Sequence, residues 1–270
     1  MKIAWLGLEP DVGLNNVLLL NKSNFSLEKL KEFKPDIVVE REFNADGLDW
    51  HKEIPLIKQE LPDVKTAVWL IDTHVRLEFH KQYAKLFDYV FLAISKYLDE
   101  IDHPNKFWLP LCFTASSVKK YPEDRPYHIG FVGRYDVKHL EERTAFMYMI
   151  KDIFPKFHLL TDFNTVYDSM GKIEYMVNLS YNGDMNFRTF ESLACGCGLI
   201  TSDVPDLYKI KGLAEKITIF DSFNSCIDAI RSKIDVKPKD HSDWVMKNHT
   251  LKNRIKAIVE MIETNIQKEF

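Results

Sequence analysis

The fold of this 270-residue chain is indicated most directly by the stretch NFRTFESLACGCGLITSD at residues 186–203. Its order of polar, apolar and glycine positions predicts a loop, a short helix, a break at Gly196 and a buried strand. Glu191 falls about one turn into the predicted helix, and Gly196 is suited to end that helix in a left-handed conformation. A helix followed directly by a buried strand is typical of α/β sheets.

On both sides of this stretch, strand-like runs alternate with helical runs, which predicts parallel α/β layers. Strands are expected at residues 2–8, 36–39, 66–71, 89–94, 106–113, 128–132, 157–161, 177–180, 198–201 and 217–220. Helices are expected at residues 26–33, 50–61, 76–87, 140–154, 172–176 and 225–233, with a final helix from about residue 243 to the end. Because a polar, proline-bearing stretch at 116–126 interrupts the alternation, the chain is predicted to form two Rossmann-like domains joined by a linker.

Candidate functional positions follow from this architecture. In open parallel sheets, ligands bind beyond the carboxyl ends of the strands. The residues directly after predicted strands are therefore candidates, and they lie at 40–42, 72–74, 133–138 and 181–188. The charged run Glu40-Arg41-Glu42 is interpreted as a solvated strand end rather than as a binding site.

Composition and cysteine usage predict a cytoplasmic protein. A net charge of −4 and a pI of about 6.2 give no electrostatic attraction toward nucleic acid or membranes. No early stretch resembles a signal peptide, and no apolar run is long enough to span a bilayer. Cys112, Cys195, Cys197 and Cys226 form no C-x-x-C pair and no cluster with zinc spacing. We expect these cysteines to be buried free thiols in a reducing compartment, with no metal site in the chain.

Three stretches of the second half resemble the donor-binding domain of GT-B glycosyltransferases of group 1, in particular the group that includes the spore-maturation protein CgeB. The stretch at 130–134 (GFVGR) resembles the strand and turn that open this domain, and the stretch at 249–254 (HTLKNR) resembles the start of its closing helix. The stretch at 186–196 resembles the group's N-x-R-x-F-E-x-L-A-C-G segment. This resemblance covers about half of the chain. The first half of the chain resembles the family more loosely, through the stretches at 67–72 (AVWLID) and 108–111 (WLPL).

The resemblance implies a GT-B fold with two Rossmann-like domains that face a cleft. Its parts are an acceptor-side domain at 1–115, a linker at 116–126, a nucleotide-sugar domain at 127–240 and a C-terminal helix at 241–270 that crosses back to brace the first domain. The implied activity is metal-independent transfer of a sugar from a UDP- or GDP-linked nucleotide-sugar to an acceptor hydroxyl, with no tightly bound cofactor. The acceptor is left open among a glycan, a protein, a small molecule and a modified DNA base.

Donor-binding residues are carried over from the family onto the matching positions of this chain. Glu191 matches the carboxylate that accepts hydrogen bonds from the ribose hydroxyls. Many retaining GT-B enzymes place another glutamate eight residues earlier, where this chain has Gly183, and the neighbouring Asp184 is the candidate replacement. The leaving nucleoside diphosphate gains negative charge, which cations, backbone N–H groups and a helix N-terminus stabilise. The candidates for contact with this part of the donor are Gly133, Arg134, Lys138, Asn186 (also the expected N-cap), Phe187, Arg188 and Thr189.

Asp72 and His74 are the candidate catalytic residues, because they follow a buried strand of the first half. An inverting reaction needs a base for the acceptor hydroxyl. Either residue suits that role, since histidine titrates near neutrality and a buried aspartate can be tuned. In a retaining reaction the donor phosphate takes the proton, and the two residues only position substrates. The sequence leaves both mechanisms open.

Two other functions are compatible with the sequence. A non-catalytic GT-B-like protein that binds a nucleotide or a glycan is compatible with Gly183 in place of the family glutamate. A phage-type glycosyltransferase that acts on DNA bases is compatible with the compact chain and with its content of Lys, Asn, Ile, Phe and Tyr, which AT-rich genomes favour. The negative net charge argues against this second alternative.

Overall fold

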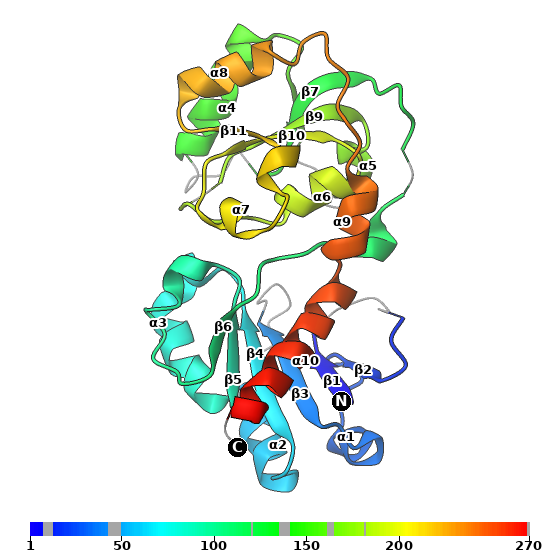
Figure 1. Cartoon of the computed structure of the whole chain (residues 1–270), viewed down its shortest axis with the longest axis vertical. Helices are drawn as coiled ribbons and strands as arrows, with labels where there is room; N and C mark the ends of the chain where they lie inside the picture. The colour runs from blue at the N-terminus through cyan, green and yellow to red at the C-terminus, as the bar shows by residue number, and fades with distance from the viewer. Residues whose placement is uncertain are drawn as a thin grey trace. The chain divides into compact units, whose positions relative to one another are not determined.

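The computed structural model describes residues 1–7, 13–42, 50–119, 121–134, 141–160, 165–180 and 182–268. Contacts between residues divide the chain into two compact units. Unit 1 comprises Met1–Pro110 and Leu251–Phe270, and unit 2 comprises Leu111–Thr250. Each unit is built around its own parallel β-sheet, against which helices pack (Figure 1).

Within the described residues, the sheet of unit 1 has six parallel strands in the order β2-β1-β3-β4-β5-β6. These strands are β1 (Ile3–Leu6), β2 (Val17–Leu20), β3 (Ile37–Glu42), β4 (Lys65–Leu70), β5 (Tyr89–Leu92) and β6 (Lys106–Trp108). The helices between them are α1 (Leu27–Phe33), α2 (Glu53–Glu60) and α3 (Thr73–Tyr83), with the short 3-10 helices η2 (Ala84–Leu86) and η3 (Ser95–Tyr97). The last helix, α10 (Leu251–Lys268), also belongs to unit 1.

The alternation of side chains along the strands of unit 1 produces two buried faces. One face joins the first three helices in a single core that contains Ala4, Val38, Val68, Val90, Leu30, Ile54, Ile57 and Tyr83. On the opposite face, Trp5 of β1 and Trp69 of β4 meet edge to face, with their ring centroids 6.4 Å apart. Burial of both faces is the usual arrangement for a parallel sheet and explains why these strands read as continuous apolar runs.

Helix α10 packs on the rest of unit 1, Met1–Pro110, although the two are far apart in the sequence (Figure 1). Arg254 donates from Nε to the Pro110 carbonyl at 2.7 Å, and the Asn265 amide donates to the side-chain oxygen of Asn105 at 3.0 Å. Among the α10 side chains whose burial is described, the buried apolar ones are Leu251, Ile255, Ile258 and Ile262. Their spacing of three and four residues places them on one face of the helix.

In the described part of unit 2, five parallel strands form a sheet in the order β11-β10-β9-β7-β8. These strands are β7 (Tyr127–Val132), β8 (His158–Leu160), β9 (Ile173–Asn178), β10 (Gly198–Ser202) and β11 (Thr218–Phe220). The helices are α4 (Glu141–Ile153), α5 (Val166–Met170), α6 (Arg188–Ala194), α7 (Asp206–Lys209), α8 (Phe223–Arg231) and α9 (Ser242–Asn248), with the 3-10 helices η4 (Ala115–Ser117) and η5 (Ala214–Lys216).

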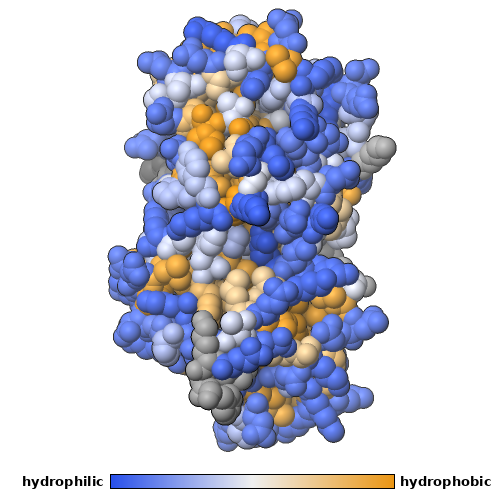
Figure 2. Space-filling view, viewed as in Figure 1, coloured by the Kyte–Doolittle hydropathy of each residue, from blue (hydrophilic) through white to orange (hydrophobic). Residues whose placement is uncertain are grey.

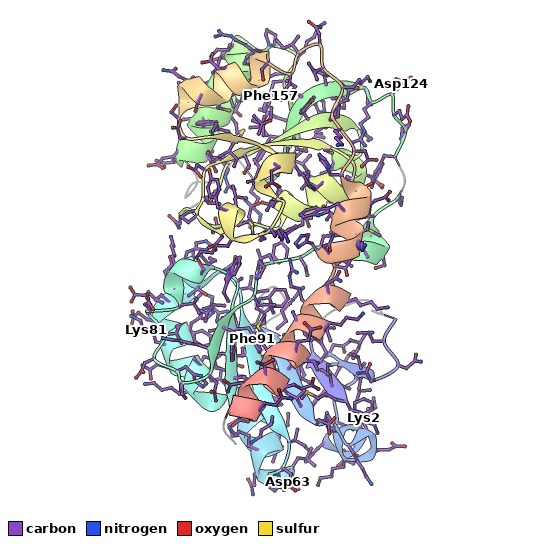
Figure 3. All side chains as sticks on the ribbon, in the orientation of Figure 1. Lys2, Asp63, Lys81, Phe91, Asp124 and Phe157 are labelled. Atoms are coloured by element: carbon purple, nitrogen blue, oxygen red, sulfur yellow. The ribbon has the colours of Figure 1, made fainter. Side chains whose placement is uncertain are left out.

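Helices α4 and α8 share one core with the sheet of unit 2, and α5 and α6 contact its strands β7, β9 and β10. That core contains Ile129, Phe131, Met147, Ile150, Tyr175, Val177, Ile200, Cys226, Ile227 and Ile230. Figure 3 shows the side chain of Phe157 inside unit 2 and that of Phe91 inside unit 1, whereas Asp124 projects outward. The carboxyl ends of β7 and β9 therefore belong to a well-packed layer.

Unit 2 differs from the sequence prediction between residues 166 and 178. The sequence predicts a helix at 172–176 and a strand at 177–180, whereas the structure has α5 ending at Met170 and β9 running from Ile173 to Asn178. All six residues of β9 are buried. Burial on both faces removes the alternation of apolar and polar residues that distinguishes a strand, so the prediction is wrong here.

The helix predicted from residue 243 to the end is two helices in the structure, α9 and α10. The break falls at His249 and Thr250, whose backbones pair with another segment. The Phe113 N–H donates to the His249 carbonyl at 3.3 Å, and Phe113 forms a parallel β-bridge with Thr250. A helix does not continue through residues whose backbone is engaged in this way. As a result, α9 belongs to unit 2 and α10 to unit 1.

The surface of the chain is mixed in character. Figure 2 shows a face on which hydrophilic residues predominate and apolar residues form scattered patches. Among the residues that the structure describes, no helix combines the length and the hydropathy needed to cross a bilayer. The same residues contain no group of three or more His, Cys, Asp or Glu side chains arranged to hold a metal ion. The four cysteines are free and buried.

Candidate functional site

The turn after β7 is built around Gly133, which has a φ of 155°. A Cβ atom at this position would lie 2.9 Å from the Cζ atom of Arg188. Arg188 begins α6 and donates from Nε to the carbonyl of Val132. The guanidinium therefore packs directly against the end of β7, and both this contact and the φ of residue 133 favour glycine there.

Arg188 and Glu191 share a poorly solvated environment on α6. Burial lowers the pKa of Arg188, and the nearby Glu191 charge opposes this shift. Burial raises the pKa of Glu191, whereas Arg188 and the hydroxyl of Tyr167 favour its charged form. Each of the two charges therefore stabilises the other where water is scarce.

Glu191 forms part of the wall of a pocket with a volume of about 410 Å³. The other residues of this wall are Ser117, Lys119, Thr165, Val166, Tyr167 and Asp168. The Tyr167 hydroxyl donates to Glu191 Oε1 at 3.3 Å, and Lys119 Nζ lies 3.1 Å from Asp168 Oδ1. The pocket therefore presents donors and acceptors in a space suited to a small polar ligand.

The side chain of Asn186 does not cap α6, contrary to the sequence prediction. The N-cap is Phe187, which is partly buried, and no side chain caps the helix. The Asn186 amide instead donates to Asn178 Oδ1 at 3.0 Å, and the Asn178 amide donates to Thr201 Oγ1 at 3.1 Å. Asn186 is drawn away from the helix because the ends of β9 and β10 offer these partners.

Three buried side-chain oxygens around α6 accept or donate no hydrogen bond within the described part of the chain. They are Asn186 Oδ1, Thr189 Oγ1 and Ser192 Oγ. Buried polar atoms are normally paired in folded proteins. The helix that carries Arg188 and Glu191 therefore has unused hydrogen-bonding capacity beside both charges.

Asp184 is buried at the end of a tight turn. Asn182 and Gly183 have positive φ values of 58° and 69°, a pair typical of type I′ turns and of the sequence Asn-Gly. The Ser180 hydroxyl donates to Asp184 Oδ1 at 3.0 Å. This geometry gives Gly183 a conformational role, and it places the Asp184 carboxylate within the loop that leads to α6.

The other predicted phosphate-side residues are Arg134 and Lys138. Arg134 is exposed directly after the Gly133 turn, and Lys138 lies outside the described residues. Arg143 of α4, which the sequence analysis does not select, donates to the carbonyls of Arg134 at 3.3 Å and of Leu179 at 3.2 Å. Since these carbonyls follow β7 and β9, Arg143 ties two neighbouring strand ends together.

The predicted catalytic residues Asp72 and His74 lie at the carboxyl end of β4, where the chain turns into α3. Asp72 has a φ of 56° and precedes the helix without a capping hydrogen bond from its side chain. Aspartate is one of the few residues besides glycine that tolerate this left-handed conformation. Both side chains are partly buried.

The charged run at the end of β3 is buried, so its interpretation as a solvated strand end is wrong. Glu40 and Glu42 are 1% and 6% exposed. Glu42 pairs with Arg76 and, at 2.9 Å, with Nε2 of His80, and the Tyr83 hydroxyl donates to Glu40 Oε2 at 2.6 Å. The two carboxylates can be buried because α3 supplies a hydrogen-bond or ion-pair partner for each of them, and buried charges need such partners.

Comparison with known proteins identifies the family. A family model described as glycosyl transferase-like matches residues 117–260, which is more than half of the chain. The chain belongs to the glycosyl transferase-like family. The matched range contains Gly133, Arg188, Glu191 and Tyr167. No curated protein sequence matches the chain.

Solved structures of this family's fold resemble the chain despite low sequence identity. HepE of Anabaena, in complex with UDP and glucose, has a TM-score of 0.58 at 9% identity, with 97% of this chain and 99% of that chain covered. Sucrose-phosphate synthase from Thermosynechococcus elongatus has a TM-score of 0.57 at 10% identity, with 89% and 76% covered. The chain spans 59% of the matched chain of the GtfA/B complex, at a TM-score of 0.49 and 12% identity, with 88% of this chain covered. The first two structures confirm the predicted GT-B fold of two parallel-sheet α/β units.

Tyr167, Lys119 and Arg143 are residues of the candidate site of this glycosyl transferase-like chain that the sequence does not indicate. Tyr167 is 24 residues from its partner Glu191, and Lys119 is 49 residues from its partner Asp168. No motif or spacing relates these positions. Only Arg143 has a position that the sequence could indicate, because it lies in the first turns of a helix that follows a strand. Many residues share such a position, so this signal does not single out Arg143.

Acidification should destabilise unit 1 through His80. This side chain is fully buried, its Nδ1 lies 3.1 Å from Thr73 Oγ1, and it pairs with Glu42. Burial, and then the charge of Arg76, lower the pKa of His80 to about 4, against the opposing pull of Asp72. An unfolded histidine has a pKa of about 6.5, so the unfolded chain binds more protons between the two values. The unfolding free energy is therefore expected to fall from about pH 6.5 to about pH 4, by on the order of 2–3 kcal/mol from this group.

Chemical denaturation of the wild type and of His80→Gln at several pH values from 7.5 to 4 measures this effect. The variant is less stable near neutrality because it disturbs a packed site. The stability gap between the two proteins should shrink as the pH falls, since only the wild type carries the histidine penalty. A gap that stays constant over this range would contradict the assignment.

Proposed function

We propose that this chain transfers a sugar from a nucleotide-sugar donor to an acceptor hydroxyl, and that the donor binds on unit 2. The proposal rests on the order in which three features lie beside the strand ends of unit 2. They are the Gly133 turn backed by Arg188, the Glu191 carboxylate, and the pocket beside Tyr167. This order corresponds to the diphosphate, ribose and base of a nucleoside diphosphate. The UDP and glucose in the HepE structure support a nucleotide-sugar as the donor.

The diphosphate end of the donor would rest on the Gly133 turn. Breaking the bond at the anomeric carbon leaves negative charge on the nucleoside diphosphate. Arg188 is held against the turn, and Arg134 follows it in an exposed position. A preorganised group that contacts the developing negative charge stabilises the transition state by on the order of 3 kcal/mol. We propose that these cations, with Lys138 as a further candidate, take the place of a metal ion.

The nucleoside would extend from Glu191 into the adjoining pocket. A carboxylate accepts two hydrogen bonds at once, which matches the paired hydroxyls of ribose. In the pocket wall, Lys119 offers a donor and Asp168 an acceptor for the base. Uracil and guanine both present donors and acceptors, so UDP- and GDP-linked sugars are both proposed donors. The remaining proposed donor contacts are Asp184, Asn186, Phe187 and Thr189.

The acceptor side of the reaction is proposed to lie on unit 1. Asp72 and His74 follow the carboxyl end of β4, the edge at which parallel sheets bind ligands. Their proposed roles are to receive the proton of the acceptor hydroxyl or to position the acceptor. The segments at 186–196 and 249–254 further support a place for this chain in the CgeB-like subgroup.

Nucleotide binding is expected to raise the thermal stability of the protein. Purified protein is heated with a panel of UDP- and GDP-linked sugars and with free UDP and GDP. A ligand at a hundredfold excess over its dissociation constant adds about 2.7 kcal/mol of stability, or roughly 5–10 °C in Tm for a chain of this size. The shift should come from one nucleotide class and should be lost in Glu191→Ala and reduced in Arg134→Ala. The absence of any shift with every nucleotide would contradict the proposal.

Catalysis is then separated from simple binding by following the donor. The nucleotide-sugar that stabilises the protein is incubated with it, and release of the free nucleoside diphosphate is measured with and without EDTA. We expect release that EDTA does not reduce. Binding without any release, in the presence of a panel of hydroxyl acceptors, would favour a nucleotide-binding protein instead.

A further inference from the structure

We propose that Tyr167 is a positioning residue that aims the Glu191 carboxylate at the ribose hydroxyls, so that the site selects ribonucleotides over deoxyribonucleotides. The proposal rests on the proposed function. It goes beyond that function because it concerns a residue outside the family-like segments and the choice between two sugars within the nucleotide itself.

Tyr167 connects three segments of unit 2 at one point. Its hydroxyl donates to Glu191 Oε1 at 3.3 Å, which joins α5 to α6. The backbone of Thr114, just before η4, acts to lower the pKa of the same hydroxyl, against the effect of burial. The carbonyl of Tyr167 accepts a weak hydrogen bond from Cys195 Sγ at 3.9 Å. Because an ionised carboxylate only accepts hydrogen bonds, the proton of this contact belongs to the tyrosine hydroxyl and is directed toward Glu191.

This contact leaves one side of the Glu191 carboxylate for a ligand. The Tyr167 hydroxyl contacts only one of the two carboxylate oxygens, Oε1. The carboxylate also borders the pocket, so its remaining acceptor positions face the space where the nucleoside is proposed to bind. A site built to receive two hydroxyls leaves a buried acceptor unsatisfied when one of them is missing, and it therefore discriminates against the deoxy sugar.

The charge state of Glu191 depends on the same tyrosine. The charged or titratable groups around this carboxylate are Arg188 on its own helix, Cys195 at the C-cap of that helix, Tyr167 on α5, and Lys119 and Asp168 in the pocket wall. Burial raises the pKa of Glu191, and the hydrogen bond from Tyr167 acts against that rise. Burial also raises the pKa of Tyr167, so its hydroxyl stays protonated and able to donate. Loss of this donor would leave Glu191 protonated over a wider pH range, with one acceptor fewer for ribose.

The test compares Tyr167→Phe with the wild type on two pairs of ligands, UDP with 2′-deoxy-UDP and GDP with 2′-deoxy-GDP. Dissociation constants are measured by titration calorimetry on the full chain. The wild type should prefer the ribonucleotide of the binding pair by about tenfold or more. In Tyr167→Phe the affinity for the ribonucleotide should fall about tenfold, while the affinity for the deoxynucleotide stays the same. The preference should thus largely disappear.

A pH series adds a readout that a purely structural role would not move. Ribonucleotide affinity should weaken on acidification as Glu191 becomes protonated. This loss should begin at a higher pH in Tyr167→Phe than in the wild type, because the variant lacks the donor that favours the carboxylate.

Tyr208→Phe is the matched control, since Tyr208 of α7 also hydrogen-bonds a carboxylate, that of Asp203, but on the exposed surface. This variant should keep the wild-type preference and the wild-type pH profile. An equal loss of affinity for both sugars in Tyr167→Phe would show a structural role only and overturn the inference, as would an unchanged preference. If the wild type binds neither nucleotide, the proposed function falls first and the inference with it.

Discussion

Replacing Gly133 with alanine is expected to abolish nucleotide binding while the protein stays folded. The added Cβ atom would lie 2.9 Å from the guanidinium carbon of Arg188, inside any normal contact distance. Either the turn or the arginine must move, and both belong to the proposed diphosphate site. Displacement of a binding group by about 1 Å costs on the order of a hundredfold. The dissociation constant of the preferred nucleoside diphosphate, measured by calorimetry, should rise by at least that factor.

Gly212→Ala is the matched control for this prediction. Gly212 also lies in unit 2 and also has a positive φ, 78°, but an added Cβ would meet nothing closer than 3.6 Å. The variant should lose about 1 kcal/mol of stability from backbone strain and bind nucleotide like the wild type. Unchanged affinity in Gly133→Ala would show that the diphosphate does not rest on the turn after β7.

Replacing Arg188 with methionine is expected to reduce both folding stability and nucleotide binding. The substitution removes the hydrogen bond to the Val132 carbonyl and leaves the partly buried Glu191 carboxylate without its nearby cation. A charge-assisted hydrogen bond of this kind contributes about 1.5–3 kcal/mol. Denaturation should show a loss of roughly this size. The pKa of Glu191 should rise further, because burial is then opposed by Tyr167 alone among the groups named for it.

Arg231→Met is the control, because Arg231 lies on the surface of α8 and pairs with the exposed Asp228 at 3.4 Å. Exposed pairs contribute little, so this variant should be within about 0.5 kcal/mol of the wild type. The conservative Arg188→Lys keeps the charge but lacks the planar donor, and we expect it to recover stability only in part. Wild-type nucleotide affinity in Arg188→Met would exclude this arginine from the donor site.

Much of the fold could be predicted because local patterns record it. The sequence predicts a helix that starts at Ser26, and in the structure the Ser26 Oγ accepts the Lys29 N–H at 3.2 Å, as a capping residue should. The helix, glycine break and buried strand at 186–203 also appear as α6, Gly196 with a φ of 71°, and β10. In both places the residue types that form the element are adjacent in the chain, so the sequence alone carries the signal.

The predictions failed where a segment's structure depends on partners elsewhere in the chain. β9 is buried on both faces, so its residues lack the alternation that marks a strand. The closing helix breaks at His249 because Phe113, far away in sequence, bonds its backbone. Glu42 is buried because α3 brings Arg76 and His80 to it. None of these partners can be recognised from the residues of the segment whose structure it changes.

Residue types at short spacing are sufficient to predict the α/β class, the glycosyl transferase-like segments and the candidate carboxylate Glu191. The surroundings of that carboxylate depend instead on how the chain folds. Folding places Arg188 against a turn after a strand that ends 56 residues earlier, and it places Tyr167 from another helix on one carboxylate oxygen. The physical reason is that periodicity reports which residues are buried, whereas the direction and charge state of a buried group are set by the neighbours that folding brings to it.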